Sequence, residues 1–378
     1  MSPQILAPDR QVYRYVRWYI TTMKLPDRAT MPFWILVVIL VGLVAFAAGR
    51  FLPPVGPTAP TKVSVISASL YASLIGAAAT AAGVDIALQA AGSVAAARQV
   101  ALTPSAFSLF ASVDPTVISS ILYPDDASWY ISVAWDRMVL GYSSQASQAP
   151  TMANLNARIQ ADLAAGNTSD ALNATHSALD LVFAPGSRIG FSNPNTDPEG
   201  YRALMVLQLA GLAFYGNATH YVELFDAAQA NGNVVTVDAG SKLFSYIQSG
   251  LIDYDIAIYE SAALGAAIPS VRLAPQVDLG EVDYANGYAA AKVNITINGQ
   301  TLTMIGAPVL LALTIPTLAP DADRASRIVL YLLSPDGHAL MGSLQIRPLS
   351  PATVSGNATA LPPLLHAVMG SSLLQAAG

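Results

Sequence analysis

The stretch GFSNPNTDPEGYR, residues 190–202, combines a helix start with two carboxylates. Asp197 stands where an N-cap is expected, Pro198 suits the first helical position, and the apolar run ALMVLQLAGLAF that follows predicts a helix. The N-terminus of such a helix attracts anions through its free N–H groups and its dipole. Asp197 and Glu199 bring negative charge to the same place. The stretch therefore raises the question of which anion tolerates a carboxylate beside it.

Two further turns of small residues, SASL (67–70) and AGSV (91–94), each join the end of an expected strand to the start of an expected helix. A serine at such a junction caps the helix or offers its hydroxyl group to a bound oxyanion. Spacing alone leaves both interpretations open. Glu199, in a first helical turn, is interpreted as a structural residue that stabilises the helix dipole.

The elements around these turns alternate between strand and helix. Expected strands are KVSVIS (62–67), DIALQAAGS (85–93), FSLFAS (107–112), WYISVAWDRMVLGYS (129–143), NVVTVD (233–238) and DYDIAIY (253–259). Expected helices are 69–83, 94–102, 115–123, 153–166, 221–229, 242–250 and 324–334, and a hairpin is expected over 294–304. Such alternation predicts an α/β fold with a parallel sheet and ligands at the carboxyl ends of its strands.

Five segments, taken in order, resemble the archaeal tungstate/molybdate-binding proteins of ABC transporters. They are AAGSVAAAR (90–98), FASVD (110–114), WYISVAWDRMVLGY (129–142), GFSNPNTDPEGYRALMVLQLA (190–210) and LIDYDIAIYES (251–261). The resemblance covers about residues 62 to 350. It implies a two-lobed type II periplasmic-binding-protein fold that closes on one oxyanion, uses no cofactor and catalyses nothing.

The same resemblance implies where the lobes lie. Lobe 1 takes residues 62–136, lobe 2 takes residues 137–263, and residues 264–349 return to lobe 1 with closing helices. Residues 350–378 are expected to form an apolar C-terminal tail.

Carried over by position, the family's oxyanion site falls on six residues of this chain. Ser69 and Ser93 would donate hydrogen bonds, Asp197 and Glu260 would supply the two carboxylates, and Ser112 and Tyr130 would line the pocket. Asp255 is the alternative to Glu260, because the spacing in that region is uncertain by a residue or two. The family's DPCGYR motif reads DPEGYR here, so that Glu199 replaces a cysteine.

The chemistry of the implied ligand answers the question raised by Asp197. Tungsten(VI) and molybdenum(VI) are hard centres whose tetrahedral oxyanions accept additional oxygen ligands, and hard cations prefer carboxylate oxygen. Asp197 and Glu260 are therefore expected to bond to the metal of the oxyanion. Sulfate or phosphate would meet only repulsion from the same carboxylates, so the pair would select the rarer anion.

The N-terminal region predicts a membrane anchor. Residues 1–30 form a basic and aromatic tail, residues 31–51 an apolar transmembrane signal anchor, and residues 52–61 a Pro-rich linker. The basic flank places the N-terminus in the cytoplasm and the globular part outside the cell. Cleavage is the alternative, because AFAAG offers small residues and a start at Met23 would leave a short signal peptide.

Composition removes several classes of function. The net charge of −6 argues against nucleic acid, and the chain has no cysteine for disulfides or thiolate metal sites. The partners expected are a permease and an ATPase on other chains, besides the membrane. Glycosylation is expected at the N-x-[ST] sequons of Asn167, Asn173, Asn217, Asn294 and Asn357.

Two rival functions remain open from the sequence. The sequons, the anchor and the apolar C-terminal tail also suit a structural cell-surface protein that forms a layer or filament on the same fold. A hydrolase that uses Asp197 and Glu260 as paired carboxylates is the weaker rival, because no nucleophile constellation accompanies them.

Overall fold

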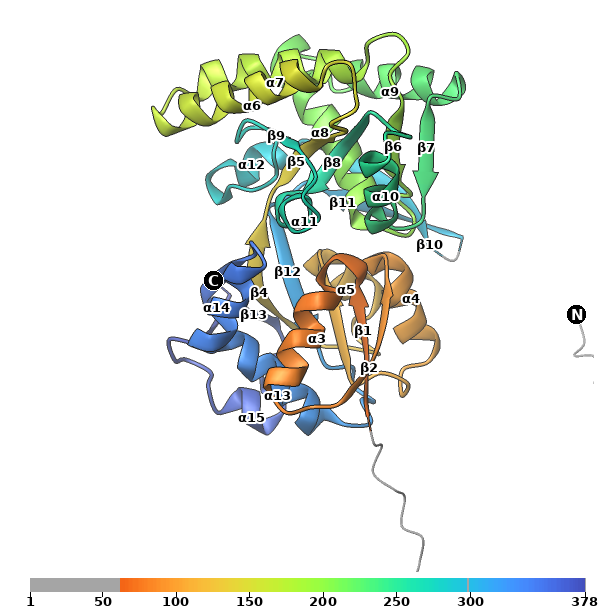
Figure 1. Cartoon of the computed structure of the whole chain (residues 1–378). Helices are drawn as coiled ribbons and strands as arrows, with labels where there is room; N and C mark the ends of the chain where they lie inside the picture. Colours follow the sequence, from red (N-terminus) through yellow and green to blue (C-terminus); the bar gives the residue numbers. More distant parts are fainter. Residues whose placement is uncertain (1–61, 298, 378) are drawn as a thin grey trace, which may run out of the picture. The chain divides into compact units, whose positions relative to one another are not determined.

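The computed structural model describes residues 62–297 and 299–377. The expected anchor 31–51, with the tail before it and the linker after it, lies outside the described residues. No helix in the described ranges is long and apolar enough to cross a membrane. The described chain forms two lobes, each built on its own β-sheet (Figure 1).

Lobe 1 contains a seven-stranded sheet in the order β14-β13-β4-β12-β3-β1-β2. Its strands are β1 (Val63–Ala68), β2 (Ile86–Ala91), β3 (Leu109–Ser112), β4 (Trp129–Asp136), β12 (Val309–Thr314), β13 (Arg347–Gly356) and β14 (Leu374–Ala376). Strands β1, β2 and β3 are parallel, as expected, whereas β12 runs antiparallel to both β3 and β4. The sheet is therefore mixed and not purely parallel. Strand β12 returns from lobe 2, lies between β3 and β4, and runs in the opposite direction to both.

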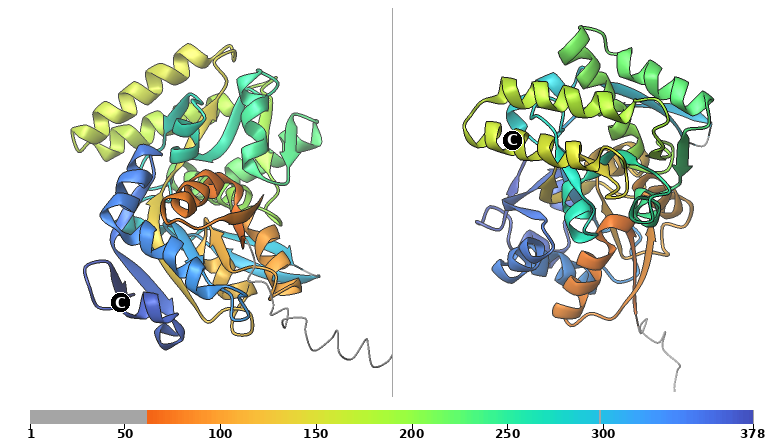
Figure 2. Two further views of the ribbon diagram at one scale, coloured as in Figure 1. Left: turned by 60° about the horizontal axis from the view of Figure 1, so that its bottom comes forward. Right: turned by 45° about the horizontal axis from the view of Figure 1, so that its top comes forward.

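Helices cover the sheet of lobe 1 (Figures 1 and 2). They are η1 (Ser69–Tyr71), α3 (Ala72–Ala81), α4 (Ser93–Leu102), α5 (Pro115–Ile121), α13 (Ala322–Leu333), α14 (Pro335–Ser343), η4 (Ala358–Ala360) and α15 (Pro363–His366). Local sequence explains their starts: Asp114 caps α5 by accepting the Thr116 N–H at 2.8 Å, and Pro115 occupies the first turn.

Lobe 2 contains a five-stranded sheet in the order β7-β6-β8-β5-β9. Its strands are β5 (Met138–Tyr142), β6 (Ile189–Ser192), β7 (Val234–Val237), β8 (Tyr254–Tyr259) and β9 (Ser270–Arg272). Its helices are α6 (Ala149–Ala164), α7 (Thr168–Val182), α8 (Pro198–Tyr215), α9 (His220–Ala230), η2 (Gly240–Lys242), α10 (Leu243–Gln248) and α11 (Glu260–Gly265). Helix α7 was not anticipated from the sequence; it packs with α6 as an outer layer (Figure 2).

The chain crosses between the lobes twice. It passes from β4 to β5 at Arg137, where the sequence indicated one long strand. It returns between β9 and β12, through η3 (Val282–Tyr284), α12 (Ala285–Tyr288) and the hairpin of β10 (Lys292–Ile297) and β11 (Gln300–Ile305). The expected end of lobe 2 at residue 263 falls inside α11. The chain stays in the five-stranded sheet beyond it, because β9 pairs with β5 through Val139 and Arg272.

The expected C-terminal tail is part of lobe 1. Strand β13 pairs with β4, and β14 pairs with β13, so residues 347–376 complete one edge of the seven-stranded sheet. Val354 and Leu374 are buried there. The Pro-, Ser- and Ala-rich composition hid these strands. The prolines of β13 lie where its pairing with β4 is irregular, between Pro348 and Thr353, and proline is tolerated at such irregularities.

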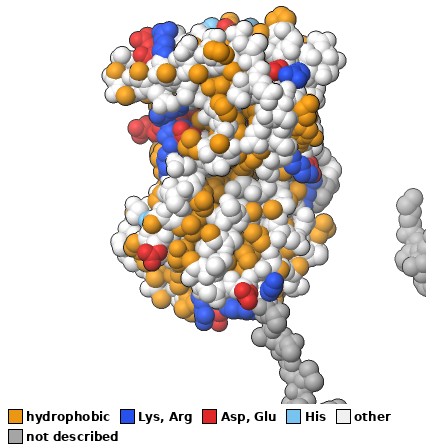
Figure 3. Space-filling view, in the orientation of Figure 1, with side chains coloured by type: hydrophobic (Ala, Val, Ile, Leu, Met, Phe, Trp, Pro, Cys, Tyr) orange, Lys and Arg blue, Asp and Glu red, His pale blue; other side chains and the backbone are white. Residues whose placement is uncertain are grey.

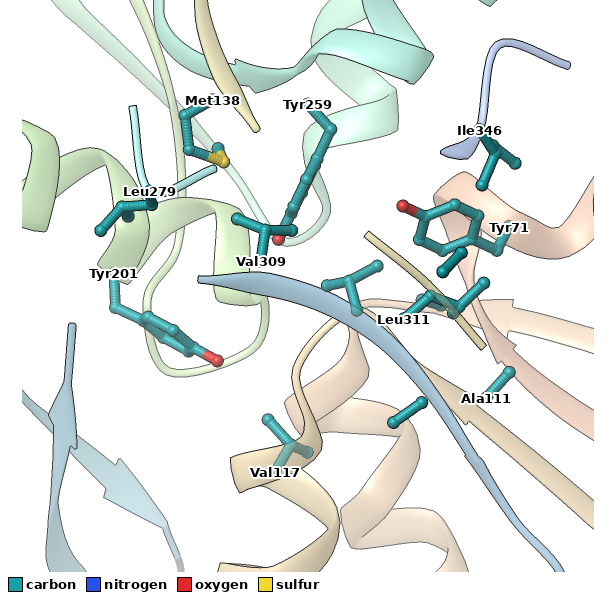
Figure 4. Packing of buried hydrophobic residues seen from close by; sticks show 14 of the residues in the cluster. Tyr71, Ala111, Val117, Met138, Tyr201, Tyr259, Leu279, Val309, Leu311 and Ile346 are labelled. Carbon is teal, nitrogen blue, oxygen red and sulfur yellow. The ribbon is translucent and has the colours of Figure 1, made fainter. Parts of the chain in front are cut away.

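One hydrophobic cluster continues through both lobes. Met138 and Tyr259 from lobe 2 and Tyr71 and Val117 from lobe 1 belong to it, together with residues of β12 such as Val309 (Figure 4). This shared packing fixes where the ends of the two sheets meet.

Candidate functional site

Four turns from the two lobes meet at the carboxyl ends of β1, β2, β6 and β7. We call them together the four-turn junction: residues 68–71 and 91–95 of lobe 1, and residues 193–197 and 238–241 of lobe 2. The hydroxyl group of Ser241 donates to that of Ser69 at 3.0 Å, and the backbone N–H of Ala95 donates to the carbonyl of Thr196 at 3.1 Å. The two lobes are therefore in direct polar contact at this place.

The turn before α4 is shaped for this contact. Ser93 is fully buried at the first position of α4, and its hydroxyl oxygen accepts the backbone N–H of Val113 at 3.2 Å. A Cβ atom on Gly92 would lie 2.3 Å from the carbonyl oxygen of Thr196 in the other lobe. Only glycine therefore allows the start of α4 to approach lobe 2 so closely.

Asp197 lies at the start of α8 and is 4% exposed. One carboxylate oxygen accepts the N–H of Glu199 at 3.1 Å, which is the N-cap bond that the sequence predicts. The other accepts the N–H of Gly240 at 2.7 Å, which joins the turn of η2 to the start of α8. Burial raises the pKa of Asp197, and these two N–H groups and nearby Arg202 partly oppose the rise.

Two more buried carboxyl groups accompany Asp197 inside lobe 2. Glu199 is 1% exposed, and neither of its carboxyl oxygens has a hydrogen-bond partner among the described residues. Burial, Asp255 and Asp197 together raise the pKa of Glu199 well above its ordinary value. Burial, with a contribution from Asp197, raises the pKa of Asp255 to about 7. Nothing in the sequence indicated that Glu199 would face other carboxyl groups.

A buried polar network joins the lobes beside the junction. Arg202 of α8 donates to the carbonyl of Val113 at 2.8 Å and lies 3.1 Å from a carboxylate oxygen of Asp114, both in lobe 1. Tyr201 donates its hydroxyl proton to the same carboxylate at 2.7 Å. Arg202 also donates to the hydroxyl of Tyr259 at 2.9 Å. These contacts explain Tyr201 and Arg202 of the opening motif as interlobe structure.

Glu260 is held by two arginines. It lies 3.3 Å from the guanidinium Nε of Arg137 at the first crossing, and it is paired with Arg347 of β13 in lobe 1. Next to it, Ser261 donates to a carboxylate oxygen of Asp136 at 2.5 Å. Figure 3 shows basic and acidic side chains side by side at one edge of the molecule, at the level between the lobes. No contact of the described residues brings Glu260 to Asp197.

Ser112 and Tyr130 do not present free groups at the junction. Ser112 ends β3 near the junction, but its hydroxyl donates to the carbonyl of Asp114 at 2.7 Å and accepts that residue's N–H at 3.1 Å. Tyr130 lies at the start of β4, six residues from Asp136, which is about 20 Å along an extended strand. Strand β4 begins beside Tyr130 and runs toward the end of the sheet that faces lobe 2. Tyr130 therefore lies at the end of the sheet that is far from the junction.

Ser241 is a residue of the four-turn junction that was not predicted from the sequence. It stands in the turn Ala239-Gly240-Ser241 between a strand and a helix, and the same Ala-Gly-Ser order occurs at residues 91–93. This repeated tripeptide was the available signal. Among the described residues, no group of three or more histidine, aspartate or glutamate side chains is arranged to hold a metal ion.

Comparisons with known proteins show which proteins this chain is similar to. A family model described as "Bacterial extracellular solute-binding protein" matches residues 67–343. An uncharacterized solute-binding protein of Petrotoga mobilis is 31% identical over 261 residues, which cover 68% of this chain and 73% of that protein. The molybdate/tungstate-binding protein WtpA of Pyrococcus abyssi is 25% identical over 284 residues, which cover 71% and 76%. The periplasmic molybdate-binding protein of Azotobacter vinelandii has a similar structure, with a TM-score of 0.48 and 15% identity over 75% of this chain and 98% of that chain.

Proposed function

The chain belongs to the bacterial extracellular solute-binding protein family, and we propose that its solute is a tetrahedral oxyanion, tungstate or molybdate, held at the four-turn junction. It is a solute-binding protein of the ABC-transporter type and not an enzyme. The name of the Pyrococcus abyssi relative supports the choice of oxyanion.

The observation that carries this proposal is the meeting of hydroxyl groups and helix starts from both lobes. Ser69 and Ser93 come from lobe 1 and Ser241 from lobe 2, and the N-termini of α4 and α8 lie beside them. Hydroxyl and backbone N–H donors at helix N-termini suit an oxyanion with oxygen atoms on every side. A ligand bound there would hold the two lobes together.

Asp197 gives this site its selectivity for a metal-centred oxyanion. A carboxylate has about four lone-pair positions; backbone N–H groups of Glu199 and Gly240 occupy two of them, and the hydroxyl group of Ser192 lies beside it. A remaining lone pair would bond to tungsten or molybdenum. We assign Glu260 a different role from the one expected, because its charge is balanced by Arg137 and Arg347. The proposed site therefore has one metal-bonding carboxylate.

A calorimetric titration of the full chain with tungstate, molybdate, sulfate and phosphate tests the proposal. We expect tungstate and molybdate to bind most tightly. Ser93→Ala should weaken all oxyanions by a similar factor, because it removes a group that contacts oxygen and not metal. Ser326→Ala is the matched control: this buried serine donates to Ala322 within α13. The absence of binding by all four anions would contradict the proposal.

We further propose that residues 31–51 tether the protein to the membrane, that residues 53–378 lie outside the cell, and that a permease and an ATPase on other chains receive the solute. The asparagines of all five sequons are exposed, which supports glycosylation of an exported chain. Protease added to intact cells should remove the globular part and leave a small anchored fragment. A globular part that is cut only after lysis would contradict this topology.

A further inference from the structure

A cavity lies between lobe 1 and the β10–β11 hairpin, and no residue of the four-turn junction lines it. Its volume is about 230 Å³. The residues that define it are Arg98 and Ala101 of α4, Ser120 and Ile121 of α5, and Gln300 and Leu302 of β11. In Figure 1 the hairpin lies between the two lobes.

The hairpin is fastened to lobe 2. Gln208 of α8 donates to the carbonyl of Lys292 at 2.9 Å and accepts its N–H at 2.8 Å. Asn195, in the loop before α8, accepts the N–H of Thr296 at 2.6 Å. The opposite wall of the cavity comes from α4 and α5 of lobe 1. A ligand in the cavity would therefore contact elements of both lobes.

In the part of the chain that the structure describes, the lining of the cavity contains one charged side chain, Arg98, and one N–H group of this side chain has no hydrogen-bond partner. Arg98 donates through Nη2 to the carbonyl of Thr296 at 2.5 Å, while its Nε is buried and has no hydrogen-bond partner among the described residues. None of the described residues that line the cavity is acidic. Arg98 is therefore the charged residue of this lining, and a guanidinium group attracts the negative charge of a carboxylate.

The other side chains that line the cavity indicate the polarity and size of the rest of the ligand. Ser120 and Gln300 offer further hydrogen bonds, whereas Ala101, Ile121 and Leu302 are apolar. The volume is below the roughly 300–1,000 Å³ that drug-sized ligands occupy. A carboxylate with a short aliphatic chain fits this combination of charge, apolar lining and size.

We infer that the cavity between α4, α5 and the β10–β11 hairpin binds a small aliphatic carboxylate, with Arg98 as its charged contact. Both lobes contribute to this site, so its occupancy stabilises the closed arrangement. Helix α4 carries Ser93 at its start and Arg98 farther along, which links the carboxylate site to the four-turn junction. By reciprocity, tungstate at the junction should strengthen carboxylate binding. This last statement alone rests on the proposed function.

Ligand-observed NMR on the full chain, with butyrate as the probe, tests the inference. Butyrate should bind with a Kd of about 1 mM, and n-butylammonium, which has an aliphatic chain of similar length and the opposite charge, should not bind. Arg98→Gln should weaken butyrate binding about tenfold, which corresponds to ~1.4 kcal/mol. Ser120→Tyr should weaken it too, by filling the cavity from an exposed position without removing the charge. Arg158→Gln, at an exposed arginine of α6, is the matched control.

Three results would overturn the inference. The first is butyrate binding that both Arg98→Gln and Ser120→Tyr leave unchanged, and the second is no butyrate binding even at ~50 mM. The third is competition between butyrate and tungstate together with loss of butyrate binding in Ser93→Ala, which would place butyrate at the junction. Binding of butyrate that depends on Arg98, in a protein that binds no tungstate, would support the cavity site and contradict only the proposed function.

Discussion

The hydroxyl groups of Ser69 and Ser241 lie 3.0 Å apart although the two residues are 172 positions apart in the chain and belong to different lobes. Each lies just after the carboxyl end of a strand, β1 in lobe 1 and β7 in lobe 2. Their contact shows that the carboxyl ends of these two strands face each other. The expected consequences of this arrangement can be tested at four residues.

Gly92→Ala should keep the lobes apart. The added methyl group would lie 2.3 Å from the carbonyl oxygen of Thr196 and 3.0 Å from the Cβ of Asp197, so one lobe must move. We expect at least about tenfold weaker tungstate binding by calorimetry. Gly342→Ala is the control, because a Cβ there meets no atom within 4 Å. Unchanged affinity in Gly92→Ala would show that binding does not need this close approach.

Asp197→Asn should reduce selectivity more than it reduces folding. The amide is a poor ligand for a metal centre, so tungstate affinity should fall at least about tenfold, or ~1.4 kcal/mol, while sulfate affinity stays level or rises. The amide offers one oxygen for two N–H groups, so stability should fall by about 1 kcal/mol. Asp321→Asn, at the N-cap of α13, controls for the exchange of a capping carboxylate for an amide, and it also removes the charge that pairs with Arg324. An unchanged ratio of tungstate to sulfate affinity would reduce Asp197 to a helix cap.

Glu260→Gln should affect closure and not selectivity. The change leaves Arg137 and Arg347 without their shared carboxylate, so tungstate and sulfate affinities should fall by the same factor of about 3 to 10. Solution scattering should show a larger radius of gyration for the variant without ligand. Glu223→Gln, on the exposed face of α9, is the control. A large loss of tungstate affinity without a matching loss of sulfate affinity would show that Glu260 bonds to the metal.

Asp255 should make stability depend on pH. Its pKa is about 7 in the folded protein, mainly because of burial, against about 3.9 for an ordinary aspartate. The folded state binds the proton more tightly than the unfolded chain, so the free energy of unfolding falls as the pH rises from about 4 to about 7. Urea unfolding at about pH 5 and pH 8 should show a drop of at least ~1 kcal/mol that is smaller in Asp255→Asn.

Asp226→Asn, at an exposed aspartate of α9, should keep the pH dependence of the wild type. Glu199 lies beside Asp255 and has its own raised pKa, so Asp255→Asn should reduce the slope without abolishing it. Equal slopes in wild type and Asp255→Asn would show that the carboxyl group of Asp255 is not held protonated in the folded state.

Local sequence determined the parts of this protein whose cause is local. The cap at Asp197, the proline that follows it and the apolar run of α8 lie within a few residues of one another, so they could be read directly from the sequence. The strands β1, β3 and β8 have buried apolar patterns and were recognised for the same reason. The resemblance of several segments to one family then implied the two-lobed fold and indicated Ser93 and Asp197 as site residues; their place in binding stays a prediction.

Only the tertiary structure decided which distant charges meet. Glu260 and Arg347 are 87 residues apart, and their pairing depends on β13, whose composition resembled a tail. Ser241 came to Ser69, and Glu199 to Asp255, because the order of strands in the two sheets brings those turns and side chains together. Strand order is set by the simultaneous packing of many residues that are far apart in the chain. A carboxylate can be found in a sequence, but its partners depend on that packing.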